Sequence, residues 1–319
     1  MSRAILLSPV GGQAIYGFIS YFQSRGFYVV GADTSATAIG RHWVDEFVMT
    51  PQIGSFGYSS AITSTLAARP GMMFISWLDR EVAYWNRSWN DGFLPQQQWR
   101  QFLMNFRPDF DQFVDKFMLS QKLERAGIKT PTTRLLVDAT TDGSESFPLF
   151  IKPRIGTGSR GARSFSGESD LKKFEPEPPE TTRDYIAQPF INGAEYTVDF
   201  FSENGVVINQ VTRVRHASRG VSLHGEIVIE PDVAVEVERF CKAFEIDGLN
   251  NVQFRRDANG ELWLIDFNPR PSGTLMLSIR AGVDMLENLT DRANGRKPAH
   301  HGLARPLKVQ RFLSEHYYE

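Results

Sequence analysis

A glycine-rich segment in the middle of the chain, KPRIGTGSRG at residues 152–161, constrains the fold more than any other feature. It follows an apolar run typical of a strand, and the strand-like residues 162–165 come after it. Glycines let backbone N–H groups approach an anion closely, and Lys152 adds a point charge suited to phosphate. The segment lacks the Gly-Lys-Ser/Thr end of a P-loop, and its mid-chain position argues against a dinucleotide turn. We therefore predict a hairpin that covers phosphates, with a flexible surface loop as the alternative.

The N-terminal third has the pattern of an open parallel α/β unit. Two apolar runs, at residues 4–7 and 27–32, flank a glycine turn and a helical pattern. A third apolar run at 72–77 is followed by Asp79 and Glu81, at the strand end where such sheets bind ligands. The glycine turn departs from G-x-G-x-x-G, which favours a structural turn or a substrate contact over a dinucleotide site.

A second polar cluster ends the strand-like stretch LWLIDFNPRPSG at residues 262–273. Asp266, Asn268 and Arg270 alternate, so their side chains share one face of a strand. Gln253 lies on the expected partner strand, across a turn at Asn259-Gly260. Oxygens of this kind suit one hard cation, since Mg²⁺ is held by few protein groups together with substrate phosphates. The alternative is a polar strand end with no ligand.

Two further segments carry weaker signals. In AQPFINGAEYTVDF, residues 187–200, an apolar connector separates Gln188 from Glu195, which suggests a hinge, although the residues alone favour a plain hairpin. Residues 211–225 are rich in arginine and histidine. The candidates there for holding an anion are Arg213, Arg215, His216 and Arg219, with Arg215 preferred and Arg280 as a weaker choice outside the segment.

Taken in order, these motifs resemble the ATP-grasp superfamily, and most closely the branch of the carbamoyl-phosphate synthase large chain, here with one ATP-grasp unit. DKFMLSQKLERAGIKTPTT at residues 115–133 resembles the entry into the ATP-binding lobe. The resemblance implies an α/β ATP-grasp fold with an N-terminal Rossmann-like pre-ATP-grasp domain at residues 1–110. A small lobe with the phosphate-covering loop at 111–188 and a large lobe with the metal site at 189–319 would follow.

The resemblance also implies residue roles. Lys116 and Lys152 would hold the ATP phosphates, and Arg270 would face an acyl phosphate, with Arg215 and Lys152 as further catalytic candidates. Asp266 stands where the family usually has glutamate, and the neutral Gln253 occupies the first metal position. The other implied nucleotide contacts are Gly156, Gly158, Ser159 and Gly161 in the loop, Gln188, Pro189 and Ile191 at the base, and Glu195 at the ribose. The implied ligands of magnesium, for which manganese could substitute, are Gln253, Asp266 and Asn268.

The implied function is an ATP-dependent ligase that activates a carboxylate as an acyl phosphate and transfers it to an amine or a related nucleophile, giving ADP and phosphate. An amino acid or small carboxylic acid is the expected substrate. The alternatives are phosphorylation of bicarbonate or carbamate in the manner of carbamoyl-phosphate synthase, and an ATP-binding sensor without catalysis. A dinucleotide-dependent oxidoreductase is the least favoured.

Composition limits the remaining classes. A formal net charge of −2 provides no field that draws the chain to nucleic acid or anionic lipid, so small molecules are the expected partners. The single Cys241 cannot form an internal disulfide or a cysteine-rich zinc site. No apolar run approaches the roughly 20 residues of a membrane span, and the first residues lack a secretory pattern. We expect a cytoplasmic protein, with a homodimer left open.

Overall fold

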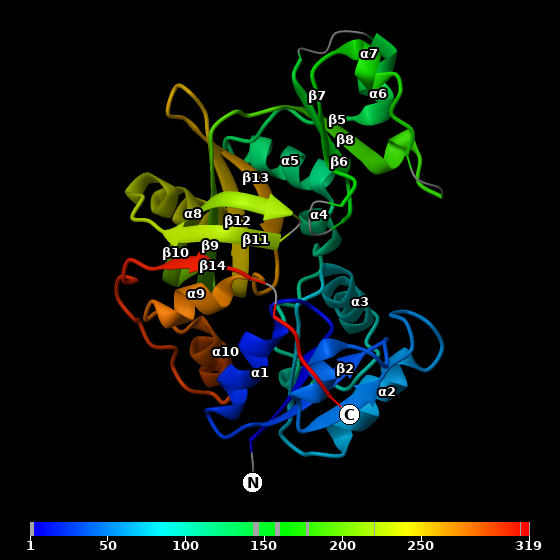
Figure 1. Ribbon diagram of the computed structural model, residues 1–319, viewed down its shortest axis with the longest axis vertical. Helices are drawn as coiled ribbons and strands as arrows, with labels where there is room; N and C mark the ends of the chain where they lie inside the picture. The colour runs from blue at the N-terminus through cyan, green and yellow to red at the C-terminus, as the bar shows by residue number, and fades with distance from the viewer. Residues whose placement is uncertain are drawn as a thin grey trace.

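The computed structural model describes residues 3–142, 147–156, 160–176, 179–219, 221–312 and 314–318. Within these residues the strands form three sheets, which follow one another along the long axis of the molecule (Figure 1). We call them the N-terminal sheet, the small sheet and the large sheet. The small sheet lies at the top of Figure 1, the large sheet in the middle, and the N-terminal sheet at the bottom.

The N-terminal sheet is parallel, with strand order β3-β2-β1-β4. Its strands are short apolar runs because helices cover a parallel sheet on both faces. The parallel pairing confirms the predicted α/β unit at the N-terminus. The strands are β1 (Ala4–Ser8), β2 (Tyr28–Asp33), β3 (Glu46–Met49) and β4 (Met73–Ser76). The helices are α1 (Ile15–Gln23), α2 (Tyr58–Ala67) and α3 (Asp79–Asn90), with short turns η1 (Ile39–His42) and η2 (Gln98–Gln101).

The small sheet is antiparallel, with strand order β5-β8-β6-β7. The glycine-rich segment joins β6 to β7, so the predicted hairpin is confirmed. Residues 157–159 at its tip, which include Gly158 and Ser159, lie outside the described residues. The elements are β5 (Arg134–Leu135), α6 (Leu136–Asp142), β6 (Leu149–Pro153), β7 (Arg163–Phe165), α7 (Glu168–Leu171), η3 (Thr182–Asp184) and β8 (Tyr185–Pro189).

The large sheet is also antiparallel, with order β13-β12-β9-β10-β11-β14. Successive side chains of a strand point to opposite faces, so Phe200 packs with helix α8 while Phe201 packs with helices α9 and α10. The strands are β9 (Ala194–Glu203), β10 (Val206–Arg219), β11 (Val221–Ile227), β12 (Gly248–Arg256), β13 (Leu262–Asn268) and β14 (Lys308–Gln310). The helices are α8 (Pro231–Phe244), α9 (Leu275–Arg280) and α10 (Met285–Ala293).

Between the N-terminal sheet and the small sheet lie two consecutive helices, α4 (Asp111–Val114) and α5 (Lys116–Arg125). Asp115 causes the break between them, because its carboxylate accepts the backbone N–H groups of Phe117 and Met118 and caps α5. Leu119 and Leu123 of α5 pack into the core beneath the large sheet, although the motif order assigned residues 111–188 to the small lobe. The three-domain division at residues 110/111 and 188/189 remains a proposal.

The N-terminal sheet and the large sheet share one hydrophobic core. Phe18 and Phe22 of α1 pack in the same cluster as Leu275 of α9 and Leu286 of α10, whereas the small sheet has a cluster of its own. Among the described residues, none of the helices has the length and apolar character needed to cross a membrane.

Candidate active site

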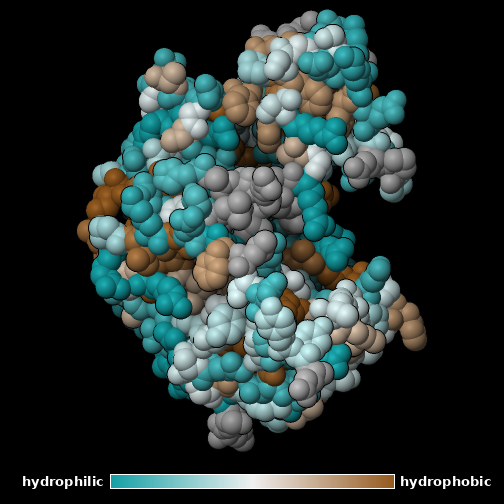
Figure 2. Space-filling view, in the orientation of Figure 1, coloured by the Kyte–Doolittle hydropathy of each residue, from teal (hydrophilic) through white to brown (hydrophobic). Residues whose placement is uncertain are grey.

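The predicted site residues surround one cavity of about 510 Å³, a size typical of small-molecule sites. Its lining comes from all three sheets or the loops beside them: Trp77 follows β4, Lys152 lies on β6, and Asp266 lies on β13. Figure 2 shows the molecule hollowed between the small sheet and the N-terminal sheet. The sequence-predicted residues in the lining are Lys116, Lys152, Gly156, Gln188, Pro189, Ile191, Glu195, Arg215, Gln253, Asp266, Asn268 and Arg270.

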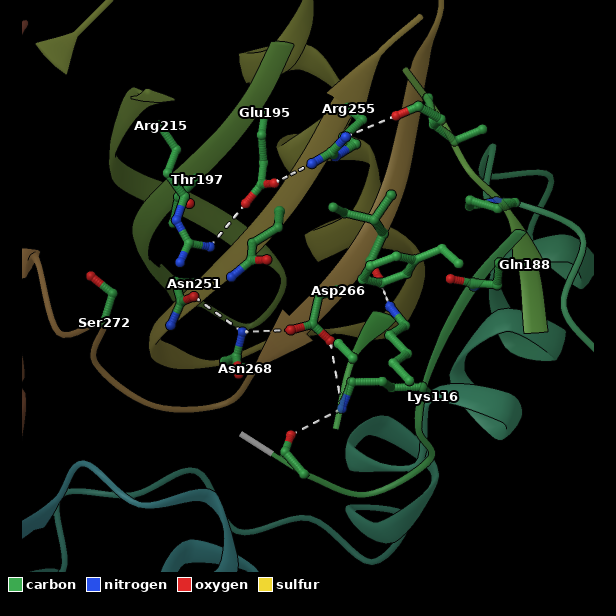
Figure 3. A pocket seen from close by; sticks show the side chains of 18 of the residues that line it. Lys116, Gln188, Glu195, Thr197, Arg215, Asn251, Arg255, Asp266, Asn268 and Ser272 are labelled. Carbon is green, nitrogen blue, oxygen red and sulfur yellow. Dashed lines mark hydrogen bonds and ion pairs between the residues drawn. The ribbon is translucent and has the colours of Figure 1, made fainter. Parts of the chain in front are cut away.

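Two lysines and one carboxylate line the cavity beside the β6–β7 hairpin, and Figure 3 shows Lys116 and Asp266 pointing toward each other. Lys116 Nζ donates to the carbonyl of Gly156 at 3.1 Å and lies 3.9 Å from Asp266 Oδ1. Lys152 Nζ is buried and donates to Ile265 O at 2.7 Å. Burial lowers the pKa of Lys152 to about 8, which the negative charge of Asp266 partly opposes. Two cations held mainly by neutral carbonyls form a place for anionic groups.

Gly161 is a described glycine of the predicted loop that does not line the cavity. It has φ of +72°, and a side chain there would contact Pro153 at 3.0 Å. This position needs glycine for the shape of the hairpin, whatever the hairpin covers.

The polar ends of β12 and β13 lie side by side, as the alternation predicted. Gln253 is opposite Asp266 in the strand register. The amide of Asn268 donates to Asp266 Oδ2 and to Asn251 Oδ1, each at 3.2 Å. Asn251 is a lining residue that the sequence reasoning missed. Its position two residues before Gln253 is the signal that could have found it, because such residues share a strand face.

The donor set limits the metal that this corner can hold. Among the residues described, no group of three or more histidine, cysteine, aspartate and glutamate side chains could hold a metal ion. The oxygens available are the carboxylate of Asp266 and the amides of Gln253, Asn268 and Asn251. Magnesium is commonly held by one or two carboxylates with water and substrate phosphates. The set therefore fits Mg²⁺ that arrives with a polyphosphate, and does not form an all-protein cage.

The segment after β8 connects two sheets, so the plain hairpin favoured by its residues is wrong. Strand β8 belongs to the small sheet and β9 to the large sheet. Gln188 is buried and its Nε2 donates to Thr133 Oγ1 at 2.8 Å. Ile191 O accepts from Arg255 Nη1 at 2.9 Å. The connector thus forms one wall of the cavity, with Pro189 and Ile191 in the lining.

Glu195 is engaged by two arginines rather than free. Its Oε1 accepts from Arg215 Nη1 at 2.9 Å, and its Oε2 accepts from Arg255 Nη2 at 2.8 Å (Figure 3). Arg255 is a second lining residue that the sequence reasoning missed. Only the register of β9 against β12 places it opposite Glu195, so no local pattern marks it.

Three other basic candidates, Arg213, His216 and Arg280, fall outside this cavity's lining. Arg213 is buried, and it pairs with Asp199 at 2.8 Å and donates to Ser272 at 3.0 Å. His216 is exposed and lies 3.2 Å from Glu226. Arg280 is exposed at the end of α9, and the side chain of Arg219 lies outside the described part. Of the candidates whose side chains are described, Arg215 is the one that lines the cavity.

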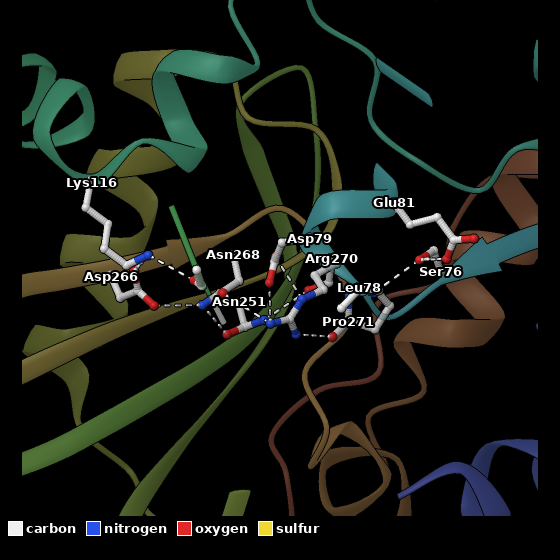
Figure 4. Close-up of polar contacts among 11 residues, drawn as sticks. Ser76, Leu78, Asp79, Glu81, Lys116, Asn251, Asp266, Asn268, Arg270 and Pro271 are labelled. Atoms are coloured by element: carbon white, nitrogen blue, oxygen red, sulfur yellow. Dashed lines mark hydrogen bonds and ion pairs between the residues drawn. The ribbon is translucent and has the colours of Figure 1, made fainter. Parts of the chain in front are cut away.

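Arg270 pairs with Asp79 across the boundary between the large sheet and the N-terminal sheet (Figure 4). Its Nε and Nη2 donate to the two carboxylate oxygens, each at 2.8 Å. Nη2 also donates to Asn268 Oδ1 at 3.3 Å, and Nη1 donates to Pro271 O at 3.1 Å. The polar strand end of β13 is therefore joined to the first residue of α3.

Comparisons with known proteins found one matching family model and several similar enzymes. Residues 181–313 match a family model described as ATP-grasp in the biosynthetic pathway with Ter operon. The chain is 24% identical over 204 residues to the carbamoyl phosphate synthase large chain of Clostridium beijerinckii, covering 59% of this chain and 19% of that protein. It is 22% identical over 182 residues to D-alanine–D-alanine ligase of Pseudomonas entomophila, covering 50% and 56%. The chain thus spans well under two thirds of these relatives.

Solved structures resemble the whole chain. N5-carboxyaminoimidazole ribonucleotide synthetase from Thermotoga maritima aligns with a TM-score of 0.70 and 18% identity, covering 100% of this chain and 82% of that one. Biotin carboxylase from Campylobacter jejuni aligns with a TM-score of 0.71 and 15% identity, covering 96% and 74%. L-amino acid ligase from Bacillus licheniformis aligns with a TM-score of 0.67 and 14% identity, covering 92% and 74%. At such identities the alignments describe the fold alone.

Proposed function

We propose that this chain, which is an ATP-grasp protein by its fold and by the family match over residues 181–313, is an ATP-dependent ligase. It binds ATP in the cavity, forms an acyl phosphate from a carboxylate, and passes the acyl group to an amine. The products are ADP, phosphate and the acylated amine. An amino acid or another small carboxylic acid is the substrate class we favour.

One observation carries the proposal. Lys116, Lys152 and Asp266 converge in one cavity, beside the glycine-rich hairpin between β6 and β7. Polyphosphate binding needs positive groups, and both lysines donate to backbone carbonyls, while Lys116 also lies 3.9 Å from Asp266 Oδ1. The carboxylate adds the cation-binding oxygens that bound triphosphate requires.

The remaining lining residues fit the parts of a nucleotide. The base would lie against the connector formed by Pro189 and Ile191, with Gln188 beside it. The ribose would lie near Glu195, whose carboxylate is shared with Arg215 and Arg255. A ribose hydroxyl bound there would accept from an arginine as readily as it donates to the carboxylate.

Magnesium would be held by Asp266 and Asn268, with Gln253 opposite them. When bound, it neutralises charge on the phosphates during transfer. One carboxylate among the protein ligands favours a single tightly held ion.

The reaction consists of two displacements. A carboxylate oxygen attacks the γ-phosphorus, the bond to the bridging oxygen breaks, and ADP leaves. The amine then attacks the acyl carbon, phosphate leaves, and the amine loses a proton. Arg270 and Arg215 are the residues we assign to the charge on the transferred group. The enclosing lobes serve to exclude water, which would hydrolyse the acyl phosphate.

The test is phosphate release from MgATP with pools of amino acids and small carboxylic acids. We expect release that depends on a carboxylate, and about a hundredfold or greater loss in Lys152→Ala and Asn268→Ala, since each removes a group at the transferred phosphoryl. Lys172→Ala is the matched control and should release phosphate as the wild type does. Lys172 is exposed at the C-terminal end of α7, where it pairs with Glu168. Full turnover in both site variants would refute the proposal.

The same assay separates the alternatives. Release driven by bicarbonate without an amino acid would support the carbamoyl-phosphate type of reaction. Tight ATP binding without release in any pool would support a sensor. A cytoplasmic location and a homodimer remain predictions beside this proposal.

A further inference from the structure

The N-terminal sheet contributes a charged residue to the centre of the proposed site. Asp79 and Arg270 are separated by 191 residues in sequence, yet both donor atoms of the arginine fork lie 2.8 Å from the carboxylate oxygens. Their side chains are only 15% and 14% exposed. A two-bond, partly buried pair of this kind is stronger and more directional than a surface ion pair.

A buried network fixes the chain on either side of Asp79. Leu78 N donates to Ser76 Oγ at 3.1 Å, and Ser76 Oγ donates to Glu81 Oε2 at 2.5 Å. Glu81 is 1% exposed and also accepts from Ser8 Oγ at 2.8 Å and from the hydroxyl of Tyr58. This network ties the ends of β1 and β4 to the first turn of α3, where Asp79 begins the helix (Figure 4).

The contacts of Arg270 leave it little freedom. A guanidinium has five N–H groups. Two point to Asp79, one to Asn268 and one to Pro271. One N–H of Nη1 therefore has no partner among the described residues. The fork is fixed next to Asn268 and Asp266, with that single donor left for an oxyanion.

We propose that Asp79 is a positioning residue, which orients Arg270 toward the phosphoryl group that is transferred. The inference rests on the proposed function. An arginine without such a partner samples many rotamers and loses that freedom when it binds the transition state. Asp79 restricts the rotamers of Arg270 before the substrate binds. The N-terminal domain therefore completes a site whose other groups lie on the small and large lobes.

The experiment compares two probes on the whole chain: MgADP alone, and MgADP with aluminium fluoride, which mimics a phosphoryl group in transfer. In the wild type, aluminium fluoride should slow the release of ADP. Asp79→Asn should leave the affinity for MgADP alone unchanged and reduce that slowing about tenfold, the effect of losing a charged hydrogen-bonded partner. Arg270→Lys should reduce it similarly, and the double variant should lose no more than Arg270→Lys alone.

The matched control is Asp91→Asn, which removes the same charge from the C-terminal end of the same helix, where Asp91 is exposed. It should behave as the wild type. If Asp79→Asn does not fold, Asp79→Ser removes the same carboxylate while keeping a small polar residue, and tests the same point.

The outcomes are distinguishable. If aluminium fluoride slows ADP release as much in Asp79→Asn as in the wild type, the pair only holds the two sheets together, and the inference is overturned. This holds whether or not the variant has a lower thermal unfolding temperature. Binding of MgADP that aluminium fluoride leaves unchanged in the wild type would also overturn it. Absence of MgADP binding to the wild type would instead reject the proposed function.

Discussion

At the scale of single residues, the cavity divides its cations into two kinds. Arg215 and Arg255 are bound to Glu195, and Arg270 is bound to Asp79. Lys116 and Lys152 instead donate to backbone carbonyls. These three arginines are therefore fixed in geometry by carboxylates. Lys152 donates to a carbonyl, whereas Lys116 also lies 3.9 Å from Asp266 Oδ1, so Lys152 is the lysine better placed to meet a phosphate. The nucleotide affinity should depend on the protonation of the buried lysine in particular.

We predict that the affinity for MgATP falls as the pH rises through about 8, the lowered pKa of Lys152. Phosphate favours the protonated amine, so above this pKa binding must take up a proton and weakens by up to about tenfold per pH unit. The change should disappear in Lys152→Met, which binds more weakly at every pH. Calorimetric titration between neutral and alkaline pH measures both effects.

Lys116→Met is the control for this prediction. It should weaken binding but keep the pH step, moved to higher pH, because the charge of Lys116 contributes to the lowered pKa of Lys152. An affinity that stays constant through the step in the wild type would contradict the assignment of Lys152 to the phosphates.

At the scale of elements, the connector between β8 and β9 decides the shape of the base-binding wall. Its turn at Gly193 has φ of +154° and lies against the backbone of Arg256, where a Cβ would overlap the carbonyl oxygen. Arg255, which precedes Arg256 on β12, donates from its side chain to Ile191 O. The position of the connector thus depends on a close backbone approach that only glycine allows.

We predict that Gly193→Ala lowers the free energy of unfolding by about 1–3 kcal/mol, because the backbone of the connector must shift. The shift moves Ile191, so the affinity for MgATP should fall as well. Urea unfolding and calorimetric titration measure the two quantities. Gly167→Ala is the control, since that glycine has extended backbone and open space around it. Equal stability of the two variants would contradict the prediction.

At the scale of the whole molecule, the lobes are joined unequally. The N-terminal sheet and the large sheet share a core, and Tyr21 of α1 donates to Asp284 beside α10 at 2.7 Å. The C-terminal residues His316 and Tyr318 also contact the ring of His42 in the N-terminal part (Figure 1). The small sheet packs around its own cluster, which includes Leu149, Ile151 and Phe165. This arrangement makes the small sheet the more independent unit.

We predict that residues 111–319 alone do not fold cooperatively, because the missing α1 leaves the apolar side chains of α9 and α10 exposed. Replacing residues 129–190 by a flexible linker should instead leave a folded protein, since that segment carries the small sheet's separate core. Size-exclusion chromatography and calorimetry compare the two. A monomeric 111–319 fragment with a sharp unfolding transition would contradict the prediction.

Local chemistry explains what could be predicted. The hairpins at the glycine-rich segment and at Asn259-Gly260 join strands that are close in sequence, so turn residues and strand periodicity specify them. The alternation of Asp266 and Asn268 likewise predicted their common face. The apolar runs of β1, β2 and β4 indicated a covered parallel sheet.

The sequence by itself therefore determined several of the elements, the shared faces of the polar strand ends and the family to which the motifs point. Tertiary structure alone decided that Glu195 pairs with Arg255, that Asp79 pairs with Arg270, and that residues 190–193 join two sheets. The physical reason is range. Periodicity and turn chemistry act over a few neighbouring residues, whereas these contacts join segments whose approach depends on how complete sheets pack.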